Sequence, residues 1–271
     1  MKIISFNVNS IRARLHQLEA VITKHAPEFI ALQETKVQDH DFPIDAIEEM
    51  GYTAVWFGQK THYGVATLSR KAPMQVQKGF VEDASAAQRR LLAGTYTLDN
   101  GSTLHLVNGY FPQGESRAHP DKFPNKRDFY VKLEKYLRIN PHKADYLAVV
   151  GDMNVAPQDL DIGLGEENAK RWLRSGKCSF LPEEREWLEN LLQTGLSDCF
   201  RQIHPEADDC FSWFDYRSRG FERDPKRGLR IDLLLGSRAL VTRCIDAGID
   251  YDVRAMERPS DHAPVWAEFT L

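Results

Sequence analysis

Residues 149–154 read Val149-Val150-Gly151-Asp152-Met153-Asn154, and residues 260–266 read Ser260-Asp261-His262-Ala263-Pro264-Val265-Trp266. In each stretch an apolar, strand-like run adjoins a short turn at Gly or Ser, and this turn carries a pair of polar side chains, Asp and Asn or Asp and His. Side chains at the ends of buried strands are held rigidly while still reaching solvent, which favours a preorganised active site. One such end would mean little, because Asp and Asn are common turn residues. The two stretches therefore predict a site only if other strand ends supply complementary groups.

Four further strand-like runs end at, or contain, such a group. Asn7 follows the run 2–6, Glu34 closely follows the run 29–32, Tyr110 follows the run 104–109, and Asp232 lies inside the run 230–235. An ionised carboxylate within an apolar run is costly unless it is paired, so Asp232 is expected to have a partner. Carboxylates, amides and water suit Mg²⁺ or Mn²⁺ rather than zinc or copper. The candidate metal ligands are Asn7, Glu34, Asp152, Asn154, Asp261 and His262.

Length and composition indicate one α/β domain spanning residues 1–271. Strand and helix patterns interleave throughout, and no Ser/Gly-rich linker, repeat or low-complexity tract divides them. A hydrophobic content of 42% supports a sizeable core, and a net charge of −4 does not by itself indicate a nucleic-acid-binding protein. The segment 217–230, however, holds six basic and two acidic residues, so it carries +4 while the rest of the chain carries −8. A basic loop on an acidic body directs a polyanion to one face.

Cysteine spacing and the amino terminus bear on the cellular compartment. The four cysteines show no CxxC or zinc-ligand spacing, which favours reduced packing or surface residues in a cytosolic protein. The first residues lack the apolar core of a signal peptide, and no apolar run approaches the roughly 18 residues of a membrane span. We therefore expect a cytoplasmic protein.

Periodicity gives the expected elements. A helix is expected from an N-cap at Ser10 to residue 26, with further helices over 123–137 and 182–194, the last stopped by Gly195. Hairpins are expected for 52–57 with 64–68 and, around Asp99-Asn100-Gly101, for 89–96 with 102–107. Apolar strands are expected at 2–6, 28–33 and 146–150, and near 211–214, 230–236, 243–249 and 264–269. The polar segment 155–178 is expected to be an ordered functional loop.

The order of these motifs resembles one family along essentially the whole chain. The motifs include Gln33-Glu34-Thr35-Lys36, Asn108-Gly109-Tyr110, Gly151-Asp152-Met153-Asn154, Arg230-Ile231-Asp232 and Ser260-Asp261-His262. They resemble the exonuclease III family of apurinic/apyrimidinic endonucleases, within the endonuclease/exonuclease/phosphatase superfamily. The resemblance implies a four-layer α/β sandwich, with two packed, mixed and mostly antiparallel sheets flanked by helices and a site at one end.

The resemblance also implies catalytic roles. Glu34 would be the main ligand of a magnesium ion, and Asn7 and Asp261 would orient the ion or complete its coordination shell. Without the resemblance, the simpler interpretation of Glu34 is a solvent-exposed residue at the end of a strand. Asp152 would activate or align the attacking water, and Asn154 would hold the water and the phosphate. Both would lie on one side of an extended strand end, whereas the simpler reading is an Asx turn.

Asp232 and His262 form a second expected pair, because a carboxylate beside an imidazole raises its pKa and fixes its tautomer. Such a histidine would contact a phosphate oxygen, while the simpler reading is a core histidine satisfied by a core aspartate. Tyr110 is the phenol that would stabilise or protonate the leaving oxygen. The sequence leaves open whether Tyr110 or Asp152 transfers the proton.

Substrate-binding residues are assigned by the same resemblance. An apolar pocket for a flipped-out baseless sugar would consist of Trp213, Leu229 and Ile231. Extrusion of such a sugar is easy because it lacks stacking and pairing. For each of the three, core packing is the alternative. Contacts to the DNA backbone are expected from Arg12, Lys36, Tyr63, Arg90 and Gln113.

The favoured function is a magnesium-dependent DNA repair nuclease, with Mn²⁺ as an alternative ion. It would cut 5′ to abasic sites, remove 3′-blocking groups and degrade duplex DNA from 3′ ends, acting as a monomer. One alternative keeps the fold but takes a phosphoinositide or another phosphodiester outside nucleic acids; the aromatic pocket and the +4 segment favour DNA. Another is a non-catalytic DNA-binding module, which would need a lost ligand, and none of the expected ones is missing.

Overall fold

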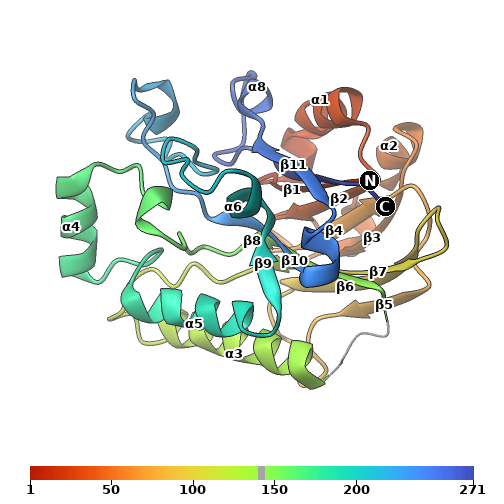
Figure 1. Ribbon diagram of the computed structural model, residues 1–271, viewed down its shortest axis with the longest axis horizontal. Coiled ribbons are helices and arrows are strands. Elements are labelled where there is room, and N and C mark those ends of the chain that lie inside the picture. The colour runs from red at the N-terminus through yellow and green to blue at the C-terminus, as the bar shows by residue number, and fades with distance from the viewer. Residues whose placement is uncertain (140–143) are drawn as a thin grey trace.

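The computed structural model describes residues 1–139 and 144–271 and contains two packed six-stranded sheets with helices outside them (Figure 1). The first sheet has the order β11 (Cys244–Ile249), β12 (Val265–Phe269), β1 (Lys2–Asn7), β2 (Phe29–Gln33), β4 (Val65–Ser69) and β3 (Thr53–Phe57). The second has the order β5 (Gln75–Lys78), β6 (Leu91–Thr97), β7 (Thr103–Tyr110), β8 (Tyr146–Asp152), β10 (Asp232–Ser237) and β9 (Leu196–Asp198). Each sheet has one parallel pair, β1–β2 and β7–β8, and its other paired strands are antiparallel, so the predicted four-layer sandwich is confirmed.

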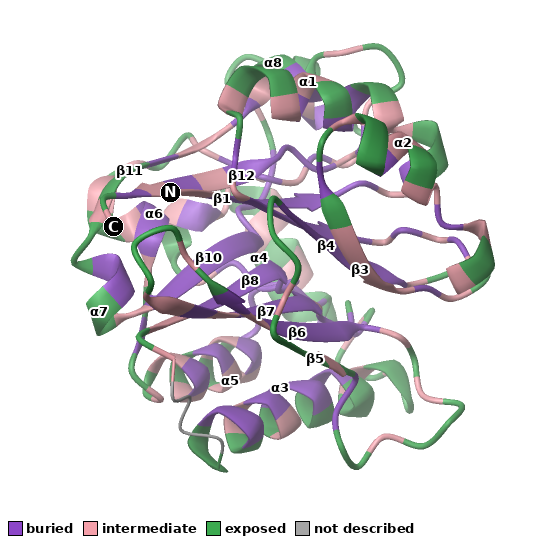
Figure 2. Ribbon diagram, turned by 90° about the vertical axis from the view of Figure 1, so that its right-hand side faces the viewer, coloured by how far each residue is buried: buried purple, intermediate pink, exposed green. Residues whose placement is uncertain are grey.

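Helices cover the outer faces of both sheets (Figures 1 and 2). Three of them, α1 (Leu15–His25), α2 (Ile44–Glu49) and α8 (Tyr251–Arg254), lie over the first sheet. Two longer ones, α3 (Lys122–Ile139) and α5 (Pro182–Leu192), lie side by side under the second. The others are α4 (Glu166–Ser175), α6 (Cys199–Ile203) and α7 (Arg238–Val241), with 3-10 turns η1 (Ile11–Ala13), η2 (Asp39–Asp41), η3 (Asp159–Asp161) and η4 (Gly220–Glu222).

Burial of both faces of each sheet explains the uninterrupted apolar strands. In β1, Ile3 packs between the two sheets while Ile4 packs under the helices of the first sheet. In β8, Val150 faces the other sheet and Val149 faces α3 and α5. Successive side chains of a strand point to opposite faces, so a strand in this position must be apolar throughout. Each such side chain contributes roughly 1.5–3 kcal/mol by leaving water.

Strand direction brings the polar ends together. The parallel register of β7 and β8 places Tyr110 opposite Asp152, and the antiparallel register of β10 places Asp232 opposite Asp152. Gly151 permits this close approach, because a Cβ there would lie 1.9 Å from the carbonyl oxygen of Gly109. Asn7 ends β1 at the same end of the sandwich, and the N-terminus lies at the opposite end of that strand.

Two local predictions were wrong. Ser10 makes no side-chain cap, and its φ of 88° precedes the short turn η1, so α1 begins only at Leu15. Residues 211–214 form no strand, because Trp213 makes only isolated bridges, to Leu229 and His262. Such bridges cannot be read from an apolar run, since they depend on distant partners. None of the helices in the described parts of the chain is both long and apolar enough to cross a membrane.

Candidate active site

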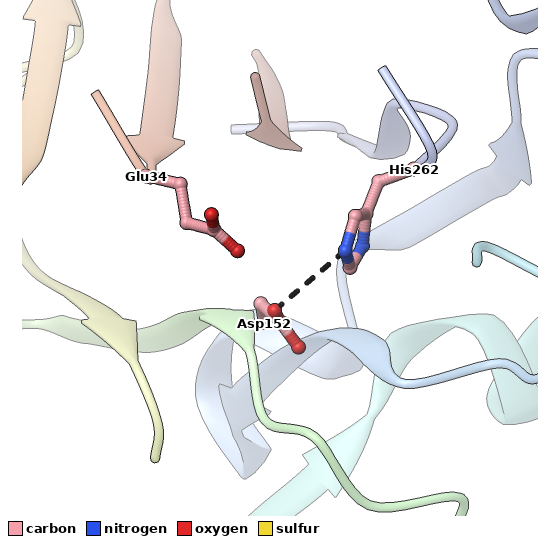
Figure 3. Close-up of side chains that lie close together, drawn as sticks. All are labelled: Glu34, Asp152 and His262. Atoms are coloured by element: carbon pink, nitrogen blue, oxygen red, sulfur yellow. Dashed lines mark ion pairs between the residues drawn. The ribbon is translucent and has the colours of Figure 1, made fainter. Parts of the chain in front are cut away.

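Three acid–base side chains converge where the two sheets meet (Figure 3). Glu34 follows β2, Asp152 ends β8, and His262 precedes β12, so the first and third come from one sheet and the second from the other. One potential ligand atom from each residue lies within 4.8 Å of the others. The Nε2 atom of His262 lies 3.8 Å from Oδ2 of Asp152.

Asn7 links the two carboxylates across the sheets. Its Nδ2 donates to Oε1 of Glu34 and to Oδ2 of Asp152, both at 3.0 Å. The other oxygen of Glu34 is paired with Lys36 at 2.8 Å. Burial would raise the pKa of Glu34, but Lys36 and Asn7 outweigh it and lower that pKa, so the carboxylate is held ionised.

His262 and Asp232 form the expected pair. Nδ1 of His262 lies 2.8 Å from Oδ2 of Asp232, which also accepts the Ser212 hydroxyl at 2.6 Å. Burial acts to lower the pKa of His262, but Asp232 and then Asp152 outweigh it and raise that pKa to about 10. The imidazole is therefore positively charged at neutral pH and points its Nε2 toward Asp152.

Asp152 is almost fully buried, and burial, together with Asp232 and Glu34, raises its pKa to about 7 against the opposing effect of His262. Burial also raises the pKa of Tyr110 well above its ordinary value, and Glu34 adds to this effect. Both groups can therefore carry a proton near neutrality in the absence of a cation.

Asn154 lies beside Asp152, but not for the reason expected from the sequence. Its φ of 54° shows that the extended strand has already ended, so strand alternation does not orient it. Instead its backbone N–H donates to Oδ1 of Asp152 at 3.0 Å, which is the Asx turn of the simpler reading, and its side-chain amide donates to the Phe111 carbonyl. Asn154 is thus part of an Asx turn and at the same time part of the site.

Positive φ angles mark four of the sequence-predicted positions. Glu34, Lys36, Tyr63 and Asn154 have φ between 52° and 61° although none is glycine. This conformation is uncommon for such residues and persists only where surrounding structure enforces it. The same conformation also occurs at non-glycine residues away from the site, such as Ala26 and Arg258, so it describes the loops at these positions without marking them as functional.

A cavity of about 240 Å³ opens beside these groups. Its walls include Trp213 and Ile231 but not Leu229, which is completely buried behind them with Phe180. The indole N–H of Trp213 donates to Asp261 at 3.1 Å. Three further lining residues, Trp172, Lys177 and Ser179, were not predicted from the sequence. Trp172 lies in α4 and Lys177 just after it, both within the polar segment 155–178 that was predicted only as a functional loop, and Ser179 directly follows that segment.

The remaining predicted residues divide by location. Gln113 lines the cavity, and Arg90 stacks over the rings of Tyr63 and Tyr110 at 4.2 and 4.5 Å while donating to the Tyr110 carbonyl. Arg12 is exposed and pairs with Asp41, outside the cavity lining. Asp261 lines the cavity, with its two carboxylate oxygens bonded to Asn9 and Trp213.

One basic residue of the segment 217–230 cannot meet a ligand. Arg230 is 1% exposed and pairs with Asp161 at 2.6 Å and Asp198 at 2.7 Å, so its side chain is not available to DNA. Five basic residues and two acidic ones remain, which leaves this segment with a net charge of +3 outside the core. Arg230 lies just before β10, and its partners Asp161 and Asp198 come from distant segments of the chain, so only the tertiary structure identifies them.

The donor set fits a divalent cation. Glu34 and Asp152 face each other, and their mutual repulsion contributes to the raised pKa of Asp152. A divalent ion would relieve this repulsion, and carboxylate oxygens are ligands for hard cations. Among the described residues, Glu34, Asp152 and His262 offer ligand atoms close enough to share such an ion, and His262 would coordinate it only after losing its Nε2 proton, so the two carboxylates are the main candidates.

Comparisons with known proteins agree with this geometry. The model of the endonuclease/exonuclease/phosphatase family matches residues 4–262. The chain is 55% identical to exodeoxyribonuclease III of Haemophilus influenzae over 99% of this chain and all of that protein. A Neisseria 3′ phosphatase solved with a product DNA hairpin has a TM-score of 0.90 at 38% identity, and an AP endonuclease from Archaeoglobus fulgidus has 0.89 at 31%, each covering both chains completely. This chain belongs to the endonuclease/exonuclease/phosphatase family.

Proposed function

We propose that this chain is a DNA repair nuclease of the exonuclease III type. It hydrolyses the phosphodiester 5′ to abasic sites, degrades duplex DNA from 3′ ends and removes 3′-phosphate and other 3′-blocking groups. The observation that carries the proposal is the cluster of Glu34, Asp152 and His262 beside a partly aromatic cavity. The names of the relatives support it, since they are an exodeoxyribonuclease, a 3′ phosphatase and an AP endonuclease.

The substrate is duplex DNA, bound by a monomer. A cavity walled by Trp172, Trp213 and Ile231 suits a compact sugar without a base. The exposed part of the segment 217–230 supplies positive charge for phosphates, and such contacts carry no sequence information. No comparable support exists for a lipid phosphodiester as substrate, because the relatives reported above take their names from nuclease, DNA repair or 3′-phosphatase activity.

Mg²⁺ is the proposed cofactor, with Mn²⁺ able to replace it. Glu34 is the principal ligand, with Asp152 and His262 nearby and with Asn7, Asn154 and Asp261 orienting the site. The ion supplies charge neutralisation at the scissile phosphate and at the departing oxygen. A non-catalytic DNA-binding protein would not need this arrangement.

The chain's own residues divide the remaining work. Asp152 accepts the proton of the attacking water, because its carboxylate lies at the end of β8 between Glu34 and His262 and is oriented by the Asn7 amide. Asn154 holds the water and the phosphate, and the charged His262, oriented by Asp232, stabilises charge that develops on a phosphate oxygen. Tyr110 stays protonated and can donate a hydrogen bond to the leaving oxygen.

Cleavage of a duplex with one abasic site, with Mg²⁺ and with EDTA, tests the proposal. A single cut 5′ to the abasic site that EDTA abolishes supports it. Binding without any cut would favour the non-catalytic alternative. Hydrolysis of a phosphoinositide, with no action on the duplex, would favour the other phosphoesterase.

A further inference from the structure

A completely buried ion pair lies behind the cavity and joins helices α3 and α5. Lys126 of α3 and Glu184 of α5 contact each other through Nζ and Oε1, and both side chains are fully shielded from solvent. Ions so buried are costly to desolvate, and replacing them with apolar residues is often neutral or stabilising. Two helices pack equally well through apolar contacts, so packing alone gives no reason for the pair.

The pair's other bonds lead to the cavity wall. Nζ of Lys126 donates to the carbonyl oxygen of Asn154 at 2.9 Å and to that of Gln113 at 3.3 Å. Oε2 of Glu184 accepts the backbone N–H of Ser179 at 2.8 Å. Asn154, Gln113 and Ser179 all line the cavity, yet they belong to three loops that are far apart in the sequence.

The backbone at Gly114 packs closely against the Lys126 side chain. A Cβ at Gly114 would lie 3.0 Å from Cδ of Lys126 and 2.9 Å from Sγ of Cys178. Glu184 is also anchored from its own helix, because its Oε2 accepts the N–H of Leu181 at the start of α5. The ammonium group is thus held at one point, and the two carbonyl groups are held against it.

From these contacts we infer that Lys126 and Glu184 are positioning residues that fix Asn154, Gln113 and Ser179 in the geometry needed for cleavage; the inference rests on the proposed function. Neither side chain is among those that line the cavity, so both act through the backbone. Misplacement of reacting groups by about 1 Å can reduce a rate roughly a hundredfold. The pair should therefore affect kcat more than KM.

The informative variant is the double substitution Lys126→Met with Glu184→Gln. It removes both charges together, so no unpaired ion is left buried, and the glutamine oxygen can still accept from Ser179 and Leu181. Methionine keeps similar volume but donates nothing to Asn154 and Gln113. The single variant Lys126→Met serves only to show that an unpaired Glu184 lowers the stability further.

Asp250→Asn is the matched control. Asp250 is 3% exposed and pairs with His25 at 2.7 Å and Lys24 at 2.9 Å, beneath the helices of the first sheet. It contacts no residue of the cavity lining. Both variants are compared at a temperature at which each is folded, as judged by thermal unfolding.

Two measurements test the inference. The double variant should cleave the abasic duplex with a kcat lowered roughly ten- to a hundredfold at a nearly unchanged KM, while Asp250→Asn keeps the parental kcat. Without any substrate, hydrogen exchange at residues 153–156 should become faster in the double variant alone, because the N–H of Asn154 would be held less firmly. Parental kcat and unchanged exchange in a folded double variant would overturn the inference. A parent protein that cleaves nothing would overturn the proposed function, and the exchange result would still decide the positioning role.

Discussion

Two buried groups of charges lie close to the cavity, and they are built in opposite ways. One contains Arg230 and Arg201 with Asp161 and Asp198, two cations and two anions joined by contacts of 2.5 to 2.7 Å. The other, at the site, contains the carboxylates Glu34, Asp152 and Asp232 against Lys36 and His262.

The first group balances two cations with two anions, whereas the site group keeps an excess of negative charge. The consequence is visible in the acid–base properties. Burial alone would lower the pKa of Arg230, but Asp198 and Asp161 raise it, so this ion is fixed. In the site, Asp152 is left with a pKa of about 7 and can exchange a proton. The paired charges around Arg230 therefore have a structural role, whereas the unbalanced charges at the site are available for catalysis. The predictions below test this difference, beginning with the largest effect.

Glu34→Ala should abolish most of the catalytic activity while leaving the fold intact. Removal of a cation's main ligand should cost several kcal/mol of transition-state stabilisation, a loss of about 10⁴-fold in the single-turnover rate. Binding to an uncut duplex analogue should change little. Cleavage that persists undiminished in EDTA would show that the metal assignment is wrong.

Asp161→Asn should lower the stability of the fold and leave the catalytic activity nearly unchanged. It removes one anion from the balanced group and leaves Arg230 and Arg201 with one carboxylate, so the free energy of unfolding should fall by about 3–5 kcal/mol. The cleavage rate of the folded protein should stay within a few-fold of the parent. Denaturant titration measures the free energy of unfolding, and the cleavage rate is measured on the same sample. A large loss of cleavage rate in the folded variant would show that the balanced group is not purely structural.

Asp232→Asn and His262→Asn should each lower the cleavage rate by roughly 10²-fold, a typical loss when a group that stabilises charge in the transition state is removed. Because the two side chains act as one unit, the double variant should be little slower than the slower single variant. Losses that simply multiply would show that the two residues act independently.

The protonation of His262 should make the stability of the folded state depend on pH. Its pKa of about 10 in the metal-free fold exceeds the ordinary value of about 6.5, so its charged form stabilises the folded state. This contribution is complete below pH 6.5 and is lost as the pH rises toward 10. Asp232→Asn should lower the pKa of His262, as followed by NMR of the imidazole ring. An unchanged titration would mean that Asp232 does not control the histidine.

The smallest effects are expected at the cavity wall and the basic segment. Trp213→Ala should reduce the preference for abasic over intact duplex more than it reduces affinity. Arg217→Ala should weaken binding to both duplexes alike and should lower the salt dependence by about one phosphate contact. Binding of matched duplexes at two salt concentrations measures both, and an unchanged preference in Trp213→Ala would leave Trp213 as a packing residue.

Much of the site could be predicted from the sequence because its residues follow apolar strands. The ends of β1, β2, β7 and β8 were recognisable, and they did bring Asn7, Glu34, Tyr110 and Asp152 together. Less regular segments were harder to interpret. Residues 211–214 form isolated bridges, and the contribution of Trp172, Lys177 and Ser179 to the cavity depends on how α4 and the segment after it pack.

The sequence by itself determined the spacing of the apolar residues, the polar residues at the strand ends and the resemblance to a known family. Together these indicated a four-layer sandwich with a site rich in oxygen ligands. Only the tertiary structure decided which charges pair with which. Arg230 and Arg217 belong to the same basic segment, yet one is buried between two aspartates and the other is exposed. Lys126 and Glu184 look like surface residues of two helices but meet in the interior. The reason is physical: hydrophobic patterning acts along a strand or helix, whereas an ion's environment is set by residues that are distant in the chain.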